Sequence, residues 1–212
     1  MSYKEIIEHY EKCFDDFGFS LKGVDWTKED QANIRYQVMI DSIYFYEKSF
    51  KLSKKVSVLD FGCGLSHLYN YILKKNLKQI DYTGLEISEK FFNESKKKYP
   101  QNKYILGDIL KEPSILKINY DYIILNGVFT EKRNLTYDYM FEYLKKMISI
   151  IFAKSNKAVA FNVMSKHVDY EKDILFHLSI DDMANFLSKK ISRNFIIRND
   201  YGLYEYSVYI YK

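Results

Sequence analysis

The sequence is poor in the residues that build disulfide frameworks and flexible linkers. Its 212 residues include only 2 cysteines, 2 prolines and 8 glycines. Cys13 and Cys63 lie far apart in the chain, which argues against a disulfide framework and indicates a reducing compartment. No stretch rich in proline, glycine or serine marks a domain boundary, and no internal repeat is visible. We therefore expect one domain.

The sequence also has no long hydrophobic run. No stretch approaches eighteen consecutive apolar residues, so no membrane-spanning helix is expected. The opening Met-Ser-Tyr-Lys-Glu resembles neither a signal peptide nor a lipidation site, and we expect a soluble, cytoplasmic protein. The formal net charge of +4 is spread over the chain, and lysine runs such as residues 96–98 stand beside predicted element ends. A solvated surface is therefore favoured over a nucleic-acid-binding face.

The most informative stretch is residues 56–64, which have the sequence VSVLDFGCG. Its apolar, β-branched residues predict a buried central strand. Gly62 and Gly64 then allow a sharp turn and a close approach of ligand to backbone, and residues 66–73 predict a helix whose amino end faces that turn. The third glycine of the dinucleotide fingerprint is missing, so the turn indicates a nucleotide-type cradle without specifying its ligand.

Helices and strands alternate through the rest of the chain. Two helices are predicted before the first strand, over residues 3–17 and 27–46, with Thr27 as the cap of the second. Further strands are expected at 80–85, 103–106, 121–125 and 157–163, and helices at 89–98 and 136–153. After a loop at 165–177 come a helix capped by Ser179 and a hairpin of strands 193–198 and 204–211. The alternation predicts an α/β fold with a mostly parallel sheet and helices on both faces.

Polar side chains stand at the carboxyl ends of successive predicted strands. Glu86 follows Gly64 by 22 residues, a spacing that suits a carboxylate accepting both hydroxyls of a ribose. The third strand ends in an acid, Asp108, placed to recognise an exocyclic amine, and the fourth ends in Asn126. Open α/β sheets bind ligands at this edge, so we expect these groups to line one site.

Over about residues 55–212, these motifs and the order of elements resemble the class I S-adenosylmethionine-dependent methyltransferases. The resemblance implies a Rossmann-like sheet of seven strands with an antiparallel closing strand, S-adenosylmethionine as cofactor, and residues 1–50 as a helical cap integral to a domain at 51–212. It assigns the methionine part and the approach to adenosine to Asp60, Gly62 and Gly64, the ribose to Glu86, the adenine to Asp108 and Ile109, and the sulfonium side to Asn126, and it counts Ile87 among the cofactor-binding residues. Asp60 would repel a pyrophosphate, which argues against a dehydrogenase.

The early helices resemble a feature of small bacterial methyltransferases, in which a Gly-Val-Asp-Trp segment and a glutamine precede an Arg-Tyr pair. Here these residues include Trp26, Arg35 and Tyr36. An arginine over the cofactor pocket could pair bidentately with the methionine carboxylate. A surface pair of Arg35 with Asp41 or a neighbour is the alternative.

The acceptor side is expected to consist of the early helices and the loops at 126–138 and 165–177. In the second loop, His167 is a candidate general base with Asp169 or Tyr170 nearby, although an exposed loop histidine is the commoner outcome. His9 gives no signal beyond an ordinary surface histidine. No metal is assigned, because the spacing of the loop acids is not a site signature.

The leading hypothesis is a methyltransferase for a small-molecule acceptor, with O-methylation of a sugar or metabolite precursor favoured. Asn126 starts an Asn-Gly-Val-Phe segment that lacks both prolines of the motif found in enzymes that methylate nucleobase or glutamine amino groups. Two alternatives remain, an N-methyltransferase on RNA or protein and a non-catalytic S-adenosylmethionine-binding protein. A monomer and a homodimer are both compatible with the sequence.

Overall fold

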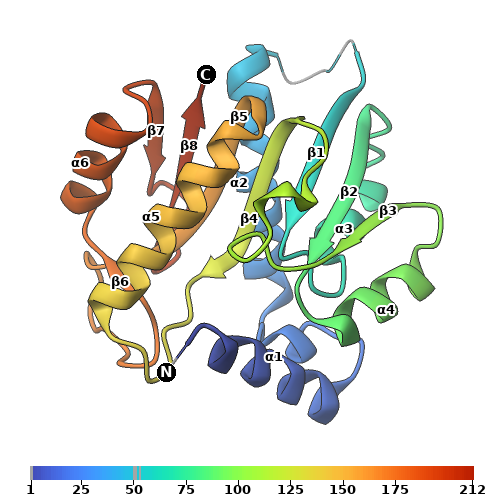
Figure 1. The fold of residues 1–212 in the computed structure, drawn as a ribbon, viewed down its shortest axis with the longest axis horizontal. Coiled ribbons are helices and arrows are strands. Elements are labelled where there is room, and N and C mark those ends of the chain that lie inside the picture. The colour runs from blue at the N-terminus through green and yellow to red at the C-terminus, as the bar shows by residue number, and fades with distance from the viewer. Residues whose placement is uncertain (1, 50–51, 53) are drawn as a thin grey trace.

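A computed structural model describes residues 2–49, 52 and 54–212 (Figure 1). Two helices precede the sheet, α1 (Lys4–Phe17) and α2 (Glu29–Glu47), with the short 3-10 helix η1 (Lys22–Val24) between them. The residue that caps α2 is Lys28, and no side chain makes a capping bond, so the predicted cap at Thr27 is wrong. The predicted boundary between residues 50 and 51 lies outside the described residues.

Five parallel strands form the centre of the sheet and alternate with helices, as predicted. The strands are β1 (Val56–Phe61), β2 (Ile80–Glu86), β3 (Lys103–Leu106), β4 (Tyr120–Phe129) and β5 (Ser155–Ser165). Between them lie α3 (His67–Lys74), α4 (Glu89–Lys98), the 3-10 helix η2 (Pro113–Ile115) and α5 (Tyr137–Ala153). The mostly parallel α/β sheet is therefore confirmed.

The carboxyl-terminal elements complete the sheet on one side. They are β6 (His177–Leu178), α6 (Ile180–Lys190), β7 (Phe195–Arg198) and β8 (Glu205–Tyr211), and the main strand order is β3-β2-β1-β4-β5-β8-β7. As predicted, Ser179 caps α6 and β8 runs antiparallel to its neighbours. The described residues contain eight strands rather than seven, because β6 pairs with the end of β5. A strand of two residues is too short to give a hydrophobic period.

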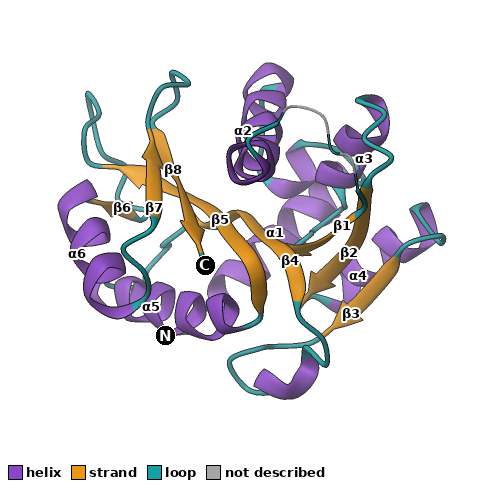
Figure 2. Ribbon diagram, turned by 90° about the horizontal axis from the view of Figure 1, so that it is seen from above, coloured by secondary structure: helices purple, strands orange, loops and turns teal. Residues whose placement is uncertain are grey.

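Helices cover both faces of the sheet (Figure 2), and each face has its own cluster of buried hydrophobic side chains. Helices α2 and α3 cover one face through Met39, Ile43 and Leu68, while α5 and α6 cover the other through Leu144, Ile148 and Leu187. Burial on both faces explains why the central strands are nearly continuous apolar runs. The polar groups at the strand ends are then left at the carboxyl edge of the sheet.

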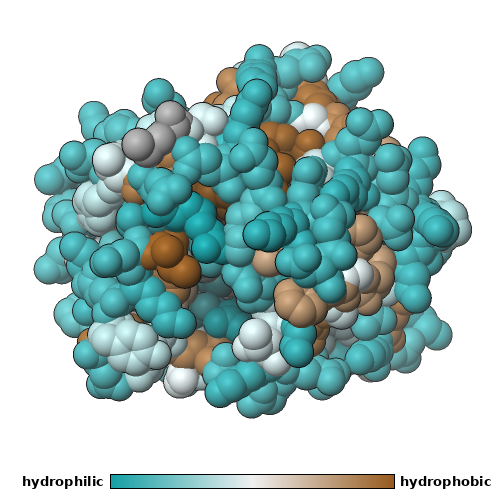
Figure 3. Space-filling model, turned by 90° about the horizontal axis from the view of Figure 1, so that it is seen from below, coloured by the Kyte–Doolittle hydropathy of each residue, from teal (hydrophilic) through white to brown (hydrophobic). Residues whose placement is uncertain are grey.

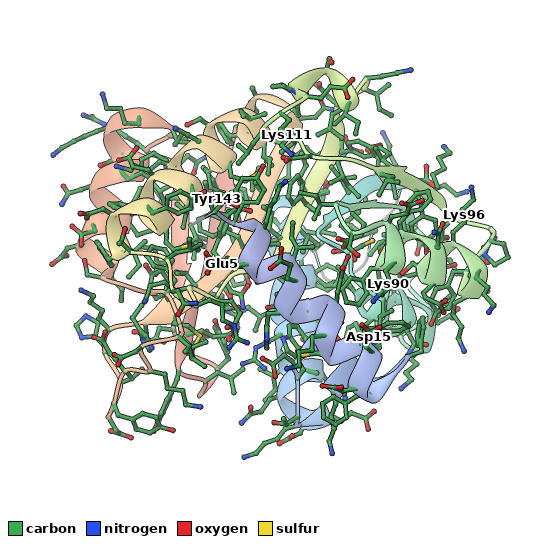
Figure 4. The ribbon with its side chains drawn as sticks, turned by 60° about the horizontal axis from the view of Figure 1, so that its bottom comes forward. Glu5, Asp15, Lys90, Lys96, Lys111 and Tyr143 are labelled. Atoms are coloured by element: carbon green, nitrogen blue, oxygen red, sulfur yellow. The ribbon has the colours of Figure 1, made fainter. Side chains whose placement is uncertain are left out.

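Helix α1 lies across that carboxyl edge (Figures 1 and 4). Near the start of α1, Tyr3 stacks on Tyr143 of α5 with ring centroids 5.4 Å apart. Near its end, Asp15 accepts a hydrogen bond from Lys90 of α4 at 2.7 Å. The helix therefore bridges the elements on both sides of the central strands. Within the described residues, no helix has the length and apolar character needed to cross a membrane.

Candidate active site

A cavity lies between α1 and the carboxyl ends of β1, β2 and β4. Viewed from this side, the surface is mostly hydrophilic and has a recess near its middle (Figure 3). Six of the residues predicted to bind the cofactor line the cavity, namely Asp60, Gly62, Gly64, Glu86, Ile87 and Asn126. The strand-end argument therefore brought together side chains from three strands, as expected for an open α/β sheet.

The turn after β1 requires its glycines. Gly62 and Gly64 have φ values of +69° and +51°, a region that side-chain-bearing residues rarely adopt. A Cβ on Gly62 would also lie 2.9 Å from Cγ2 of Val128, which lines the cavity. The bare backbone therefore leaves room for a ligand beside the amino end of α3.

The carboxylate of Glu86 is held by the backbone of two loops. Its Oε2 accepts a hydrogen bond from the Gly64 N–H at 2.8 Å, and its Oε1 accepts from Ile87 and Ser88 at 2.8 and 2.9 Å. Burial raises the pKa of Glu86, and these three hydrogen bonds oppose the rise. A carboxylate has about four acceptor sites, so acceptor capacity remains for a ligand hydroxyl.

Asp60 is a buried acid that lines the cavity and is 3% exposed. Its Oδ2 accepts a hydrogen bond from the Tyr82 hydroxyl at 2.7 Å. Burial, with a smaller contribution from Glu86, raises its pKa to about 7 despite that hydrogen bond. A cationic ligand would favour the ionised form, so this acid suits an ammonium or sulfonium group.

Asn126 has a buried side chain without protein partners. Its Nδ2 and Oδ1 are both shielded from solvent, and neither makes a hydrogen bond in the part of the chain that the structure describes. Buried amides are almost always hydrogen-bonded, so an unpaired amide in a cavity wall indicates a position completed by a ligand. The glycine cradle, the buried acid and this amide fit S-adenosylmethionine.

The two residues predicted for the adenine lie in different places. Asp108 lines a smaller recess beside the cavity, where its Oδ2 accepts a hydrogen bond from the Tyr3 hydroxyl at 2.5 Å. Burial and this acid raise the pKa of Tyr3 to about 12. Ile109 is 1% exposed within the hydrophobic core and does not line the cavity. The structure therefore brings Asp108, but not Ile109, close to the site.

The side chain of Arg35 pairs with an acid on β8 and does not line the cavity. Its Nε donates to Oε2 of Glu205 on β8 at 2.8 Å, and its guanidinium carbon lies 5.1 Å from the ring centroid of Trp26. Trp26 lines the cavity, whereas Arg35 does not. The alternative partner, Asp41, pairs with Arg198.

The predicted base and its neighbours lie on an exposed loop. The backbone N–H of His167 donates to Ser165, Asp169 accepts a hydrogen bond from Tyr204 at 2.5 Å, and Tyr170 is 57% exposed. None of the three predicted residues lines the cavity. The structure does not bring His167, Asp169 and Tyr170 together with the cofactor residues.

A charged cluster beside α1 was missed by the sequence analysis. This His9–Arg133 cluster consists of His9, Asp25, Glu131 and Arg133. Arg133 Nε lies 3.0 Å from Glu131 Oε2 and its Nη2 lies 3.5 Å from Asp25, which also contacts His9 Nε2 at 2.8 Å. Arg133 contacts the same His9 nitrogen, so we assign no metal although His9, Cys13 and Asp25 are close together.

Glu131 is the most buried charge of this cluster, with its side chain 9% exposed. Burial raises its pKa to about 7, while Arg133 opposes the rise and Asp25 adds to it. Tyr10 connects the cluster to the cavity, because it lines the cavity and its pKa is raised first by burial and then by the charge of Glu131. The one available signal in the sequence was that Glu131 and Arg133 lie in the loop at 126–138, which was predicted for the acceptor side.

Known proteins share this architecture. A model of the methyltransferase domain family matches residues 52–197. A Mycobacterium tuberculosis protein named as a methyltransferase is 22% identical over 158 residues, which cover 74% of this chain and 93% of that protein.

Two solved structures with bound cofactor or product superpose on the whole fold. Magnesium protoporphyrin IX methyltransferase from Synechocystis PCC 6803, with bound S-adenosylmethionine, has a TM-score of 0.64 at 17% identity and covers 100% of this chain and 98% of its own. The plantazolicin methyltransferase BpumL, with S-adenosylhomocysteine, has a TM-score of 0.60 at 15% identity and covers 99% of this chain and 90% of its own.

The family model spans most of the chain, and the cavity has groups that fit the cofactor of these neighbours. The protein belongs to the methyltransferase domain family and is an S-adenosylmethionine-dependent methyltransferase of the Rossmann-like class I fold.

Proposed function

We propose that the protein methylates a hydroxyl group of a small molecule, with a sugar or metabolite precursor as the favoured acceptor. The single observation that carries this proposal is the buried carboxylate of Glu131 beside Tyr10 of the cavity wall. S-adenosylmethionine supplies an activated methyl group on a sulfonium. The chain must then align an acceptor in a dry site and remove its proton.

Within the proposed site, each cofactor residue has a role that matches its chemistry. Asp60 faces the cationic methionine end, Glu86 accepts the ribose hydroxyls, and Asp108 recognises the adenine edge. The amide of Asn126, which has no hydrogen-bond partner among the described residues, faces the sulfonium side of the cofactor. These assignments use residues at three neighbouring strand ends and in the recess beside them.

Glu131 is the proposed general base. A hydroxyl acceptor must lose a proton during methyl transfer, and a base is most effective when its pKa is near the working pH. The pKa of Glu131 is raised to about 7 by burial, and the charge of Arg133, whose Nε lies 3.0 Å from Oε2, opposes the rise without making a hydrogen bond to that oxygen. His167 remains a prediction from the sequence. Neither Glu131 nor His167 lines the cavity, but Glu131 is buried beside Tyr10 of the cavity wall, whereas His167 lies on an exposed loop.

A small acceptor is favoured over nucleic acid or protein. The net charge of +4 is spread along the chain. Two structural neighbours carry names with small-molecule acceptors, magnesium protoporphyrin IX and plantazolicin. These names support the acceptor class by analogy.

The first test separates the cofactor site from the acceptor. Isothermal titration with S-adenosylhomocysteine should give micromolar binding for the parent, and Glu86→Ala should weaken it at least about tenfold, or about 1.4 kcal/mol. Transfer of labelled methyl from S-adenosylmethionine is then screened over sugars, nucleotide sugars, hydroxylated metabolites, amines and RNA. Transfer to amines or RNA alone would contradict the proposed acceptor class and leave the cofactor site intact.

A further inference from the structure

The end of β4 departs from regular pairing beside the cavity. Leu125 pairs with Phe161 and Phe129 pairs with Val163, so three residues of β4 stand opposite the single residue Asn162 of β5. The bulge turns at Gly127, whose φ is +85°. It contains Asn126, the residue with the unpaired buried amide. Bulges of this kind re-aim a side chain at the edge of a site.

Side chains hold both backbone polar groups of Gly127. Its N–H donates to Oδ1 of Asn162 at 2.7 Å, and its carbonyl accepts from the Thr130 hydroxyl at 3.0 Å. Asn162 is 0% exposed, so no water competes for this contact. Its side-chain amide therefore takes the place of the β5 backbone group with which the Gly127 N–H would otherwise pair in a regular sheet. The conformation of the bulge therefore depends on Asn162.

A buried acid determines the orientation of the Asn162 amide. Nδ2 of Asn162 donates to Oε1 of Glu205 at 3.0 Å, and Glu205 is 1% exposed. An ionised carboxylate only accepts hydrogen bonds, so the NH₂ group of Asn162 must face Glu205 and its oxygen must face Gly127. Glu205 thus fixes which end of the amide reaches the bulge.

The network closes on itself through the helical cap. Oε2 of Glu205 accepts from Arg35 at 2.8 Å, and Arg35 lies over Trp26. The ring of Trp26 in turn packs against Gly127 of the bulge, because a Cβ built on Gly127 would lie 3.3 Å from Cζ2 of Trp26. The ring of contacts runs from Gly127 through Asn162, Glu205, Arg35 and Trp26 back to Gly127.

We propose that Asn162 and Glu205 are positioning residues that hold the bulge so that Asn126 faces the sulfonium end of the cofactor. This role rests on the proposed cofactor role of Asn126 and does not depend on the identity of the acceptor. Arg35 neutralises Glu205 within the network, which explains why a residue expected at the methionine carboxylate lies outside the cavity lining.

A double-mutant cycle tests this role in the full chain. Asn126→Ala and Asn162→Ala are each expected to weaken binding of S-adenosylmethionine and S-adenosylhomocysteine by about tenfold in isothermal titration. If Asn162 acts through Asn126, the double variant binds no more weakly than Asn126→Ala alone. Losses that multiply in the double variant, or unchanged binding by Asn162→Ala, would overturn the proposal.

A second variant keeps the test decisive if Asn162→Ala does not fold. Glu205→Gln preserves shape but leaves one oxygen for two donors, Arg35 and Asn162, so the Asn162 amide must turn or lose its partner. The same cycle against Asn126→Ala should again be non-additive, and additive losses here would also contradict the proposal. Asn185→Ala, at an exposed position of α6, is the matched control and should leave binding and melting temperature unchanged.

Discussion

The proposed cofactor half and the proposed acceptor half of this site are built differently. In the cofactor half, Glu86 bonds to Gly64, only 22 residues away, and the groups are largely backbone amides and strand-end acids. In the acceptor half, Arg133 contacts His9 across 124 residues, and the groups are side chains from α1 and a loop. A site made at the ends of neighbouring parallel strands is fixed by the fold, whereas a site assembled from side chains of a helix and a loop can change with its acceptor.

The largest expected effect tests the acceptor half. Glu131→Gln removes the proposed base while keeping its shape, so we expect kcat with a hydroxyl acceptor to fall about 100-fold or more. The affinity for S-adenosylhomocysteine should not change. In the parent, kcat/KM should rise as the pH passes about 7, because Glu131 accepts a proton only when ionised. The variant should not show this rise.

His167→Ala is the comparison for that experiment. It lies on an exposed loop and should retain most of the activity. If His167→Ala lost activity while Glu131→Gln kept it, the base would belong to the loop after β5 and the comparison between the two halves would fail.

The next effect tests the cofactor half through its glycine turn. Gly62→Ala forces a side chain into a left-handed conformation and against Val128 at 2.9 Å. We expect stability to fall by about 1–3 kcal/mol and S-adenosylhomocysteine affinity to fall more than tenfold. Urea unfolding and isothermal titration measure the two quantities.

Gly202→Ala is the matched control for the turn. Gly202 also has a left-handed φ, +71°, but a Cβ there would meet nothing within 4 Å. It should show backbone strain alone, with unchanged cofactor affinity. Equal affinity losses in the two variants would show that strain, rather than the contact at the cavity, explains the effect.

A smaller effect comes from the charge of Asp60. Its pKa, about 7, lies above the ordinary 3.8, so the acid is neutral near pH 5 and ionised near pH 8. Binding of S-adenosylhomocysteine, which carries an ammonium group, should strengthen by up to about tenfold across that range. Asp60→Asn should flatten the dependence, and an equally steep dependence in the variant would assign it to another group.

The raised pKa of Asp60 also determines how the stability of the unliganded protein changes with pH. Between pH 4 and 7 the folded protein keeps a proton on Asp60 that the unfolded chain has lost, so this residue makes unliganded stability fall as pH rises through that window. Urea titrations of the parent and Asp60→Asn at pH 5 and 8 isolate that contribution.

The smallest effect concerns how α1 is held over the site. The pair of Asp15 with Lys90 is at the surface, with side-chain exposures of 60% and 35% (Figure 4). Asp15→Asn should change stability by less than about 1 kcal/mol. A large loss of S-adenosylhomocysteine affinity would instead indicate that this end of α1 controls the cofactor half.

Much of the fold and cofactor half could be predicted because parallel strands end at one edge. The positions of Asp60, Glu86 and Asn126 followed from strand ends alone, and the structure lines one cavity with them. Ile109 did not follow the rule, because its neighbour Asp108 turns toward the recess while Ile109 turns into the core.

The remaining contacts join residues that are distant in sequence. Arg35 meets Glu205 across 170 residues, and no local pattern indicates that β8 brings a buried acid to α2. Glu131 looked like an ordinary loop acid, and only its burial against Arg133 distinguishes it. Such pairs are determined by strand register and by packing between elements, and hydrophobic periodicity gives no information on either.

The buried pair of Arg35 and Glu205 limits how this enzyme could be recombined with its relatives. Exchanging the first two helices for those of another enzyme without an arginine at the same point would leave the carboxylate of Glu205 buried without its charged partner. Grafting of new acceptor specificity is therefore expected to tolerate exchange of α1, whereas α2 must be transferred together with the closing hairpin.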